Sequence, residues 1–361
     1  MNITSDNSSS LKNPFIEFTR FIAAIGIVLH HSGNEFHSGM FVGGYLLVEY
    51  FFLLSGYFTT KHFDVINCNW SSARRYAFKK YFSIAFYIII AVIIEALLAL
   101  IIGDLPMMES LLSIPFGIFP FTGTYMVRYI LDFPLWFIGD LVLVLPLIIM
   151  LMVKNKDLYK NWLCYFAPII IYSVLVTKHQ GIVIWTDNFG TFISLLCRTV
   201  AGLCLGSAVY YISNKVECIT CLKSEKRKAK SYKFIKWFGL GVWLIVDLII
   251  LLPDNFNSAL PFYSNMPIPY IGLWFIALTC IVTVSETYRR NTIYNIVMHL
   301  GKLSMPIYCI HLVILKYIQC IFTDLTLWMK CMLAILGCLL CAEILLALKI
   351  IIRKISCKSA Y

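Results

Sequence analysis

Residues 86–102 read FYIIIAVIIEALLALII, a run in which Glu95 is the only charged residue. A helix needs about 20 predominantly apolar residues to cross the hydrocarbon core of a bilayer. The apolar character begins a few residues before this run, so the stretch is long enough to span a membrane. We therefore expect it to form most of a transmembrane helix.

Similar runs recur along the chain of 361 residues, of which 60% are hydrophobic and 14% charged, against about 25% charged in an ordinary globular domain. The expected spans are 14–32, 40–60, 81–102, 134–153, 161–178, 189–212, 237–253, 267–286, 303–322 and 327–350. They predict an all-α, polytopic integral membrane protein with about ten transmembrane helices and both termini cytoplasmic. We expect residues 1–361 to form a single membrane domain, with a polar N-terminal tail at 1–13 and a basic C-terminal tail at 351–361.

The positions of the basic residues explain the net charge of +11. With a cytoplasmic N-terminus, 25 of the 30 Lys and Arg fall in or beside cytoplasmic segments. The remainder are Arg128, Lys178, Arg198, Lys316 and Lys330. Such a bias follows the positive-inside rule of membrane proteins. Topology therefore accounts for the basicity, and we expect no nucleic-acid partner.

Two stretches outside the long apolar runs bear on processing and loop structure. Residues 1–14, MNITSDNSSSLKNP, lack the basic and cleavage-site features of a signal peptide, so we expect the first helix to persist. Asn13 suits its N-cap and Pro14 its first position. The segment 103–133 mixes Pro and Gly with aromatic residues, and we expect an outer loop that partly re-enters the membrane.

The thirteen cysteines predict neither a disulfide framework nor a metal site. Most lie inside expected spans, where Cys behaves as a small hydrophobe. Cys218 and Cys221 form a CxxC pair without a second pair or a nearby histidine, so two reduced thiols are favoured over zinc. His31, Glu35 and His37 lack a further histidine and lie at flexible Ser/Gly spacing, so we expect no metal there either.

The first expected helix carries a cation near one end and two imidazoles near the other. Arg20 and His31 are eleven positions apart, which places them within about 20° of each other on one face and about 16 Å apart along the axis. His30 lies about 80° from the Arg20 direction. We therefore favour His31 over His30 for a site shared with Arg20, and the separation suits an elongated ligand such as a coenzyme A thioester.

Neighbouring acidic residues are candidates to position these groups. Glu17 lies one turn before Arg20 and can hold its guanidinium. Glu35 can orient His31 if the helix continues, although Ser32, Gly33 and Asn34 favour fraying. A purely structural interpretation stays open at this point: the arginine can snorkel to the inner interface, and the histidines can lie at the outer one.

Four stretches resemble a known family. IEFTRFIAAIGIVLHHSG (16–33) resembles the first helix of the membrane acyltransferase family 3 proteins, and VEYFFLLSGYF (48–58) their second-helix motif. PLWFIGDL (134–141) is similar to their Leu-Trp-Phe segment, and LSMPIYCIHLVIL (303–315) to their late Ser-x-Pro-x-Tyr-x-x-His helix. The four occur in order over almost the whole chain, which makes the combined resemblance specific.

The resemblance implies transfer of an acyl group, commonly acetyl, from cytoplasmic acyl-CoA to a hydroxyl of a glycan or glycolipid. On this pattern Arg20 matches the motif arginine and His31 the essential histidine, and His30 is kept as a further catalytic candidate. Our hypothesis is that His31 acts as general base, with a covalent acyl relay as the variant. Residues that match or adjoin its other motifs are candidates for substrate or structural support. These are Glu49, Ser55, Trp136, Asp140, Tyr308 and His311.

The expected coenzyme A contacts depart from the family pattern. The family often has Arg-x-x-Arg followed by Pro after its second helix, whereas RRYAFKKYFSIAF (74–86) places Ser83 and Phe86 at the matching positions. Arg75, Lys79 and Lys80 still supply charge in what we expect to be a cytoplasmic loop. They are our candidates, with Arg20, for the coenzyme A phosphates, and an ordinary positive-inside loop is the alternative.

These observations predict a multi-pass O-acyltransferase of the cell membrane, the bacterial cytoplasmic membrane being favoured. Its expected partners are acyl-CoA, with acetyl-CoA as the preferred donor, a glycan or glycolipid acceptor such as an exopolysaccharide of the cell envelope, and membrane lipids. The rival is a transporter or flippase of a lipid-linked sugar, which the lack of a visible inverted repeat disfavours. A non-catalytic scaffold is a third alternative. For most of the remaining intramembrane charges, among them Glu95, Arg198 and Lys316, we expect a structural role as an interhelical pair or an interface residue.

Overall fold

A computed structural model describes residues 12–64, 69–102, 114, 133–179, 182, 188–220, 225–252, 267–283 and 290–358. Most of the segment expected to re-enter the membrane, 103–133, lies outside these residues. The same is true of Cys221, of most of the N-terminal tail and of the last residues of the C-terminal tail.

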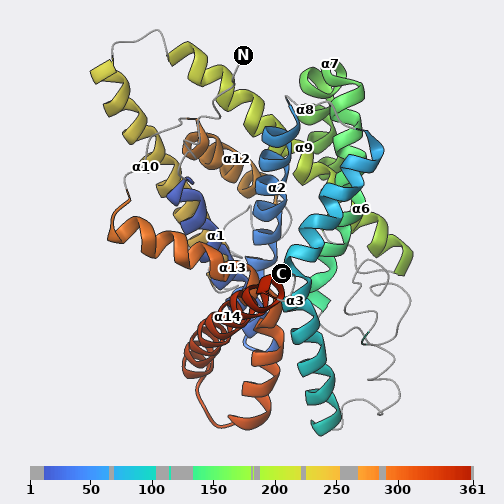
Figure 1. Cartoon of the computed structure of the whole chain (residues 1–361), viewed down its shortest axis with the longest axis vertical. Helices are drawn as coiled ribbons and strands as arrows, with labels where there is room; N and C mark the ends of the chain where they lie inside the picture. The colour runs from blue at the N-terminus through green and yellow to red at the C-terminus, as the bar shows by residue number, and fades with distance from the viewer. Residues whose placement is uncertain are drawn as a thin grey trace.

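The described chain is all-α, as predicted, and one helix matches each of the ten expected spans (Figure 1). The helices are α1 (Pro14–Glu35), α2 (Leu47–Phe63), α3 (Trp70–Ile102), α6 (Trp136–Lys154), α8 (Cys164–His179), α9 (Asn188–Thr220), α10 (Glu225–Ile250), α12 (Ile268–Val282), α13 (Thr292–Ile321) and α14 (Leu327–Lys358). Short turns are η1 (Val42–Leu46), η2 (Phe133–Leu135), α7 (Lys156–Leu158) and the π-turn η3 (Tyr159–Leu163). Within the described residues, eight helices are long and apolar enough to cross a membrane.

The ends of α1 follow local hydrogen bonding. Asn13 caps the helix as expected, its side-chain oxygen accepting from the Phe15 amide at 3.0 Å, with Pro14 at the first position. The expected fraying at Ser32–Asn34 is wrong, because the helix continues to Glu35. The Ser32 hydroxyl donates to the Val28 carbonyl at 2.8 Å, and the Phe36 amide donates to the Ser32 carbonyl at 3.0 Å.

Several helices extend beyond the apolar runs that predicted them. α3 begins at Trp70, so the basic cluster of Arg75, Lys79 and Lys80 lies on a helix and not in a loop. Likewise, α13 begins at Thr292 and α14 continues into the basic C-terminal segment. Hydropathy marks only the part of a helix that suits hydrocarbon, whereas the backbone hydrogen bonds continue into polar sequence.

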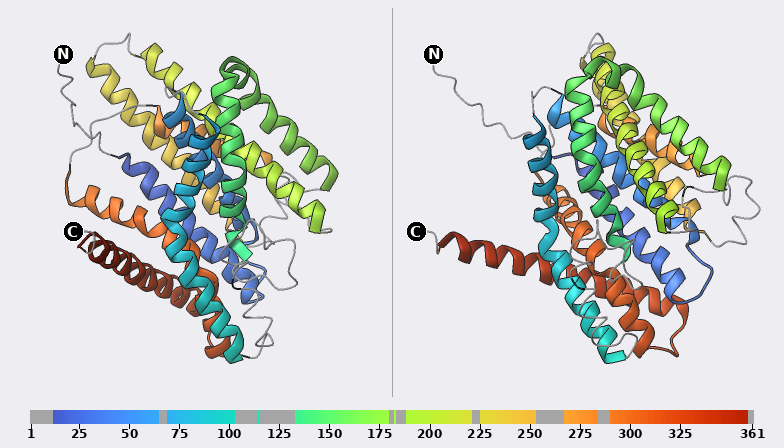
Figure 2. Two further views of the ribbon diagram at one scale, coloured as in Figure 1. Left: turned by 45° about the vertical axis from the view of Figure 1, so that its right-hand side comes forward. Right: turned by 90° about the vertical axis from the view of Figure 1, so that its right-hand side faces the viewer.

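The bundle is organised around α1 and α2 (Figures 1 and 2). α1 packs along α13, and α2, whose surface is largely buried, packs along α9. α8 and α14 expose most of their surface, and α14 leads away from the other helices toward the C-terminus (Figure 2). The two residues that open the first motif, Glu17 and Arg20, therefore lie on an element fixed by the body of the bundle.

Glycines bring α2 and α9 close together. A Cβ atom on Gly56 would lie 2.2 Å from the Leu203 carbonyl oxygen, and one on Gly206 would lie 2.0 Å from the Leu53 carbonyl oxygen. In both cases the neighbour is backbone and cannot move aside cheaply. Small residues allow helices in membranes to approach in this way.

Paired polar side chains join other helices. Lys316 on α13 contacts Glu95 on α3 at 2.5 Å, and the Trp274 indole on α12 donates to Asp247 on α10 at 3.0 Å. His299 on α13 lies 2.6 Å from Glu343 on α14. Interhelical pairing, one of the two expected roles, is confirmed for Glu95 and Lys316, and it offsets the cost of placing these charges within apolar spans.

The α2–α9 contact yields a test of the fold. Gly56→Ala should lower the thermal unfolding midpoint of the detergent-solubilised protein by about 5 °C or more, since the added methyl group meets backbone atoms. Gly241→Ala on α10 is the matched control, because a Cβ atom added there would have no heavy atom within 4 Å. Equal midpoints for the two variants would contradict the packing described here.

Candidate active site

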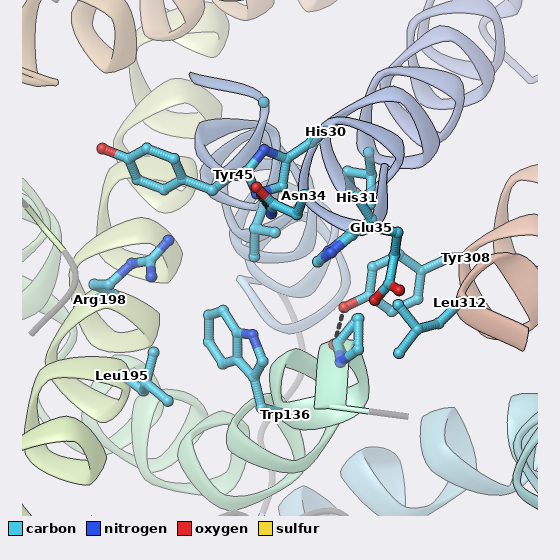
Figure 3. Close-up of a pocket in the computed structure, with 14 residues that line it drawn as sticks. His30, His31, Asn34, Glu35, Tyr45, Trp136, Leu195, Arg198, Tyr308 and Leu312 are labelled. Carbon is cyan, nitrogen blue, oxygen red and sulfur yellow. Dashed lines mark hydrogen bonds between the residues drawn. The ribbon is translucent and has the colours of Figure 1, made fainter. Parts of the chain in front are cut away.

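A cavity of about 330 Å³ lies where α1, η1, α6, α9 and α13 meet (Figure 3). Its volume falls within the range of small-molecule sites, about 300–1,000 Å³. Five predicted site residues line it: His30, His31, Glu35, Trp136 and Tyr308. With Val48 from the second motif, residues from all four motifs therefore meet at one cavity, although they are far apart in the sequence.

His31 lies among other imidazoles. Its ring centroid is 5.0 Å from that of His311 and 4.9 Å from that of His30. Within the described part of the chain, no hydrogen bond involves the His31 ring. The side chain that we favoured for chemistry is thus positioned by packing, and its ring nitrogens are available to a ligand in the cavity.

His311 is fully buried beside His31. Its Nδ1 lies 2.7 Å from the Tyr308 carbonyl oxygen, which can only accept, so Nδ1 carries the hydrogen. Nε2 is then the lone-pair acceptor, and it has no hydrogen-bond partner among the described residues. His311 therefore offers an acceptor nitrogen in direct proximity to the His31 ring.

His30 also lines the cavity, although its helical angle predicted another direction. The cavity wraps around the end of α1, so two successive positions reach it. The His30 Nδ1 donates to the Phe41 carbonyl at 3.0 Å, and Nε2 lies 3.5 Å from the Asn34 amide nitrogen. Since both ring nitrogens have protein partners, His30 is more constrained than His31.

Trp136, Tyr308 and Glu35 complete the wall beside the histidines. The Tyr308 hydroxyl donates to the Pro134 carbonyl, which joins α13 to the turn before α6. Glu35 is one turn beyond His31, on the part of α1 that we expected to fray, and it lines the cavity as Tyr308 does. Trp136 is only 8% exposed and faces the space between the two sides of the cavity.

The other end of α1 carries a separate basic group. The Arg20 guanidinium pairs with Glu17 at 3.0 Å, as expected, and retains 28% exposure of its side chain. Lys80 lies close enough to Arg20 for the two charges to interact, and its ammonium is 3.4 Å from the Thr59 hydroxyl and 5.0 Å from the Tyr76 ring centroid. Arg75 and Lys79 point to the exposed surface of α3, so only Lys80 of the basic cluster joins Arg20.

Besides His311, the predicted support residues Glu49, Ser55 and Asp140 lie outside the cavity lining. Glu49 is buried and paired with Arg198 at 2.7 Å, while Ser55 lies half-buried on α2. Asp140 is buried one turn beyond Trp136, and its Oδ2 has no hydrogen-bond partner among the described residues. Across the part of the chain that the structure describes, no group of three His, Cys, Asp or Glu could hold a metal ion.

Sequence reasoning did not select Arg198 as a site residue. This arginine was one of the few basic residues outside the cytoplasmic segments, and its expected role was that of an interhelical pair or an interface residue. The signal was present: Arg198 lies in the middle of an apolar span, and no acidic residue lies within one turn of it on the same helix. An intramembrane arginine of this kind needs partners from other helices.

Comparison with protein families gives one match that covers almost the whole chain. A search of curated proteins and a search of solved structures each found no match. The family model of an acyltransferase domain, that of acyltransferase family 3, matches residues 13–347. This range includes all four motifs and every residue that lines the cavity. The chain belongs to acyltransferase family 3 and is a membrane acyltransferase with apolar helices.

Proposed function

We propose that this protein is an O-acyltransferase that moves an acyl group, preferably acetyl, from cytoplasmic acyl-CoA to a hydroxyl of a cell-surface glycan or glycolipid. The observation that carries the proposal is the position of His31: it lines a cavity at one end of α1, with Arg20 near the other end. We place the protein in the cytoplasmic membrane of a bacterium. Membership of an acyltransferase family favours this function over transport of a lipid-linked sugar.

The donor site of the proposal extends along α1. Arg20 and Lys80 provide charge for the coenzyme A phosphates, and a guanidinium suits phosphate because it can donate two parallel hydrogen bonds. About 16 Å of helix separates Arg20 from His31. An extended pantetheine arm would cover this separation and present the thioester to the cavity.

His31 acts as the general base in this proposal. Its imidazole takes the proton from the acceptor hydroxyl as the oxygen attacks the thioester carbonyl carbon. The C–S bond breaks, and the imidazolium returns the proton to the departing coenzyme A thiolate. A covalent acyl-histidine is the variant of this route, in which His31 itself attacks first.

His311 is a positioning residue for this base. Its Nε2 can accept a hydrogen bond from the His31 ring, which would direct the other nitrogen of His31 toward the substrate. The centroid separation of 5.0 Å leaves this bond to form as the complex tightens. The Tyr308 carbonyl fixes the required tautomer of His311.

Replacing His31 tests the chemical step. His31→Ala should lower acyl-CoA-dependent CoA release and label transfer in membrane vesicles at least about 100-fold, since general base catalysis contributes about 10²–10⁴. His30→Ala should lose less than about tenfold. His299→Ala, with a side chain half exposed on α13, is the control at matched expression. Equal turnover in the wild type and His31→Ala would contradict the assignment.

Replacing Arg20 tests the donor site. Arg20→Gln should raise the KM for acetyl-CoA about tenfold or more and leave the KM for acetyl-pantetheine unchanged, because the second donor lacks the phosphates. Arg353→Gln, on the exposed end of α14, controls for loss of one positive charge. If the KM of Arg20→Gln rises equally for both donors, Arg20 does not bind the phosphates of coenzyme A.

A further inference from the structure

Arg198 is held in a buried network that the acyl-transfer step does not use. Its Nε donates to Glu49 at 2.7 Å, and the other Glu49 oxygen accepts from the Tyr172 hydroxyl at 2.5 Å. Arg198 is 1% exposed, Glu49 is fully buried and Tyr172 is 3% exposed. Three helices, α9, α2 and α8, therefore fix one guanidinium in a single orientation.

This orientation leaves part of the guanidinium without a protein partner. Nη2 of Arg198 is buried and has no hydrogen-bond partner among the described residues. Arg198 also lines the cavity, and Figure 3 places it across the cavity from His31, with Trp136 between the two sides. A buried donor without a partner costs free energy, so a rigidly held one beside a cavity is expected to meet a ligand oxygen.

The charges around Arg198 indicate which kind of ligand oxygen would accept a hydrogen bond from Nη2. Glu49 already balances the positive charge of Arg198. A ligand carboxylate or phosphate would approach the Glu49 carboxylate with no surplus cation beside it. A neutral hydroxyl oxygen accepts from Nη2 without this repulsion.

The rest of this wall suits a compact ring. The Arg198 guanidinium carbon lies 5.1 Å from the Trp136 ring centroid, so arginine and indole form one continuous surface with an apolar and a donor part. Leu195 lies beside them on α9, and Tyr45 brings a phenol to the same cavity. A few fixed polar groups on a mainly apolar wall are typical of small-molecule sites.

We propose that Arg198 and Trp136 form the subsite for the acceptor, and that the part of the acceptor entering it is an uncharged pyranose ring whose hydroxyl accepts a hydrogen bond from Nη2. The inference rests on the proposed function for the identity of the acceptor as a glycan. It adds the place where the ring binds, opposite His31, and a specificity for neutral over acidic sugars.

Saturation-transfer NMR on the full-length protein in nanodiscs, without acyl donor, tests this subsite. The neutral probes are methyl glucoside, galactoside, mannoside and N-acetylglucosaminide, and the acidic probes are methyl glucuronide and galacturonide. At least one neutral ring should give a signal about fivefold stronger than either acidic ring. Arg198→Lys keeps the charge opposite Glu49 but lacks Nη2, and it should reduce that signal at least about fivefold. Arg353→Lys is the matched control and should retain it.

A second variant covers the case in which Arg198→Lys does not fold. Leu195→Phe fills the cavity beside Arg198 without removing the ion pair, and it should reduce the signal equally. The proposal is overturned if no neutral ring gives a signal, if an acidic ring gives the strongest one, or if the folded cavity variants retain the wild-type signal. Acyl-CoA-dependent CoA release by the same wild-type protein tests the proposed function separately: release without pyranoside binding refutes the subsite alone.

Discussion

The rise of an α-helix sets the distance between the two ends of the proposed reaction site. α1 carries Arg20 near its first turns and His31 near its last, about 16 Å apart along the axis. Neither side chain can reach the other, and the helix is fixed by its packing along α13. A ligand that engages both residues must therefore be elongated, and in the proposed reaction its reacting end lies in the cavity beside His31.

The cavity depends on contacts between segments distant in sequence. η1 returns the chain after α1, and the Phe41 carbonyl at its start accepts from His30. α13 brings His311 against His31 and, through the Tyr308 hydroxyl, contacts the turn that leads into Trp136. The His31 ring is thus packed between His30, whose two ring nitrogens have protein partners, and His311, whose Nε2 has no hydrogen-bond partner among the described residues.

The helices were predictable from sequence because long apolar runs are typical of membrane-spanning helices. Each of the ten expected spans matches one helix, and eight helices of the described residues are long and apolar enough to cross a membrane. The ends of the helices were less predictable. The hydroxyl of Ser32 stabilises the last turn of α1, and the start of α3 is helical although its sequence is polar. The motif residues of α1 and α13 predicted one wall of the cavity. The opposite wall was not predictable, because the orientation of Arg198 is fixed by an ion pair with Glu49, which in turn accepts a hydrogen bond from Tyr172, and both residues lie on other helices.

The most direct test of the account is whether α1 presents its two ends to opposite sides of the membrane. Membrane-impermeant thiol reagents can be applied to sealed vesicles of each orientation carrying Arg20→Cys or His31→Cys, with the parent protein as the background for its native cysteines. The account predicts that Arg20→Cys reacts from the cytoplasmic side and His31→Cys from the outer side, with acetyl-CoA protecting the former. Reaction of His31→Cys from the cytoplasmic side alone would contradict an outward-facing acceptor site.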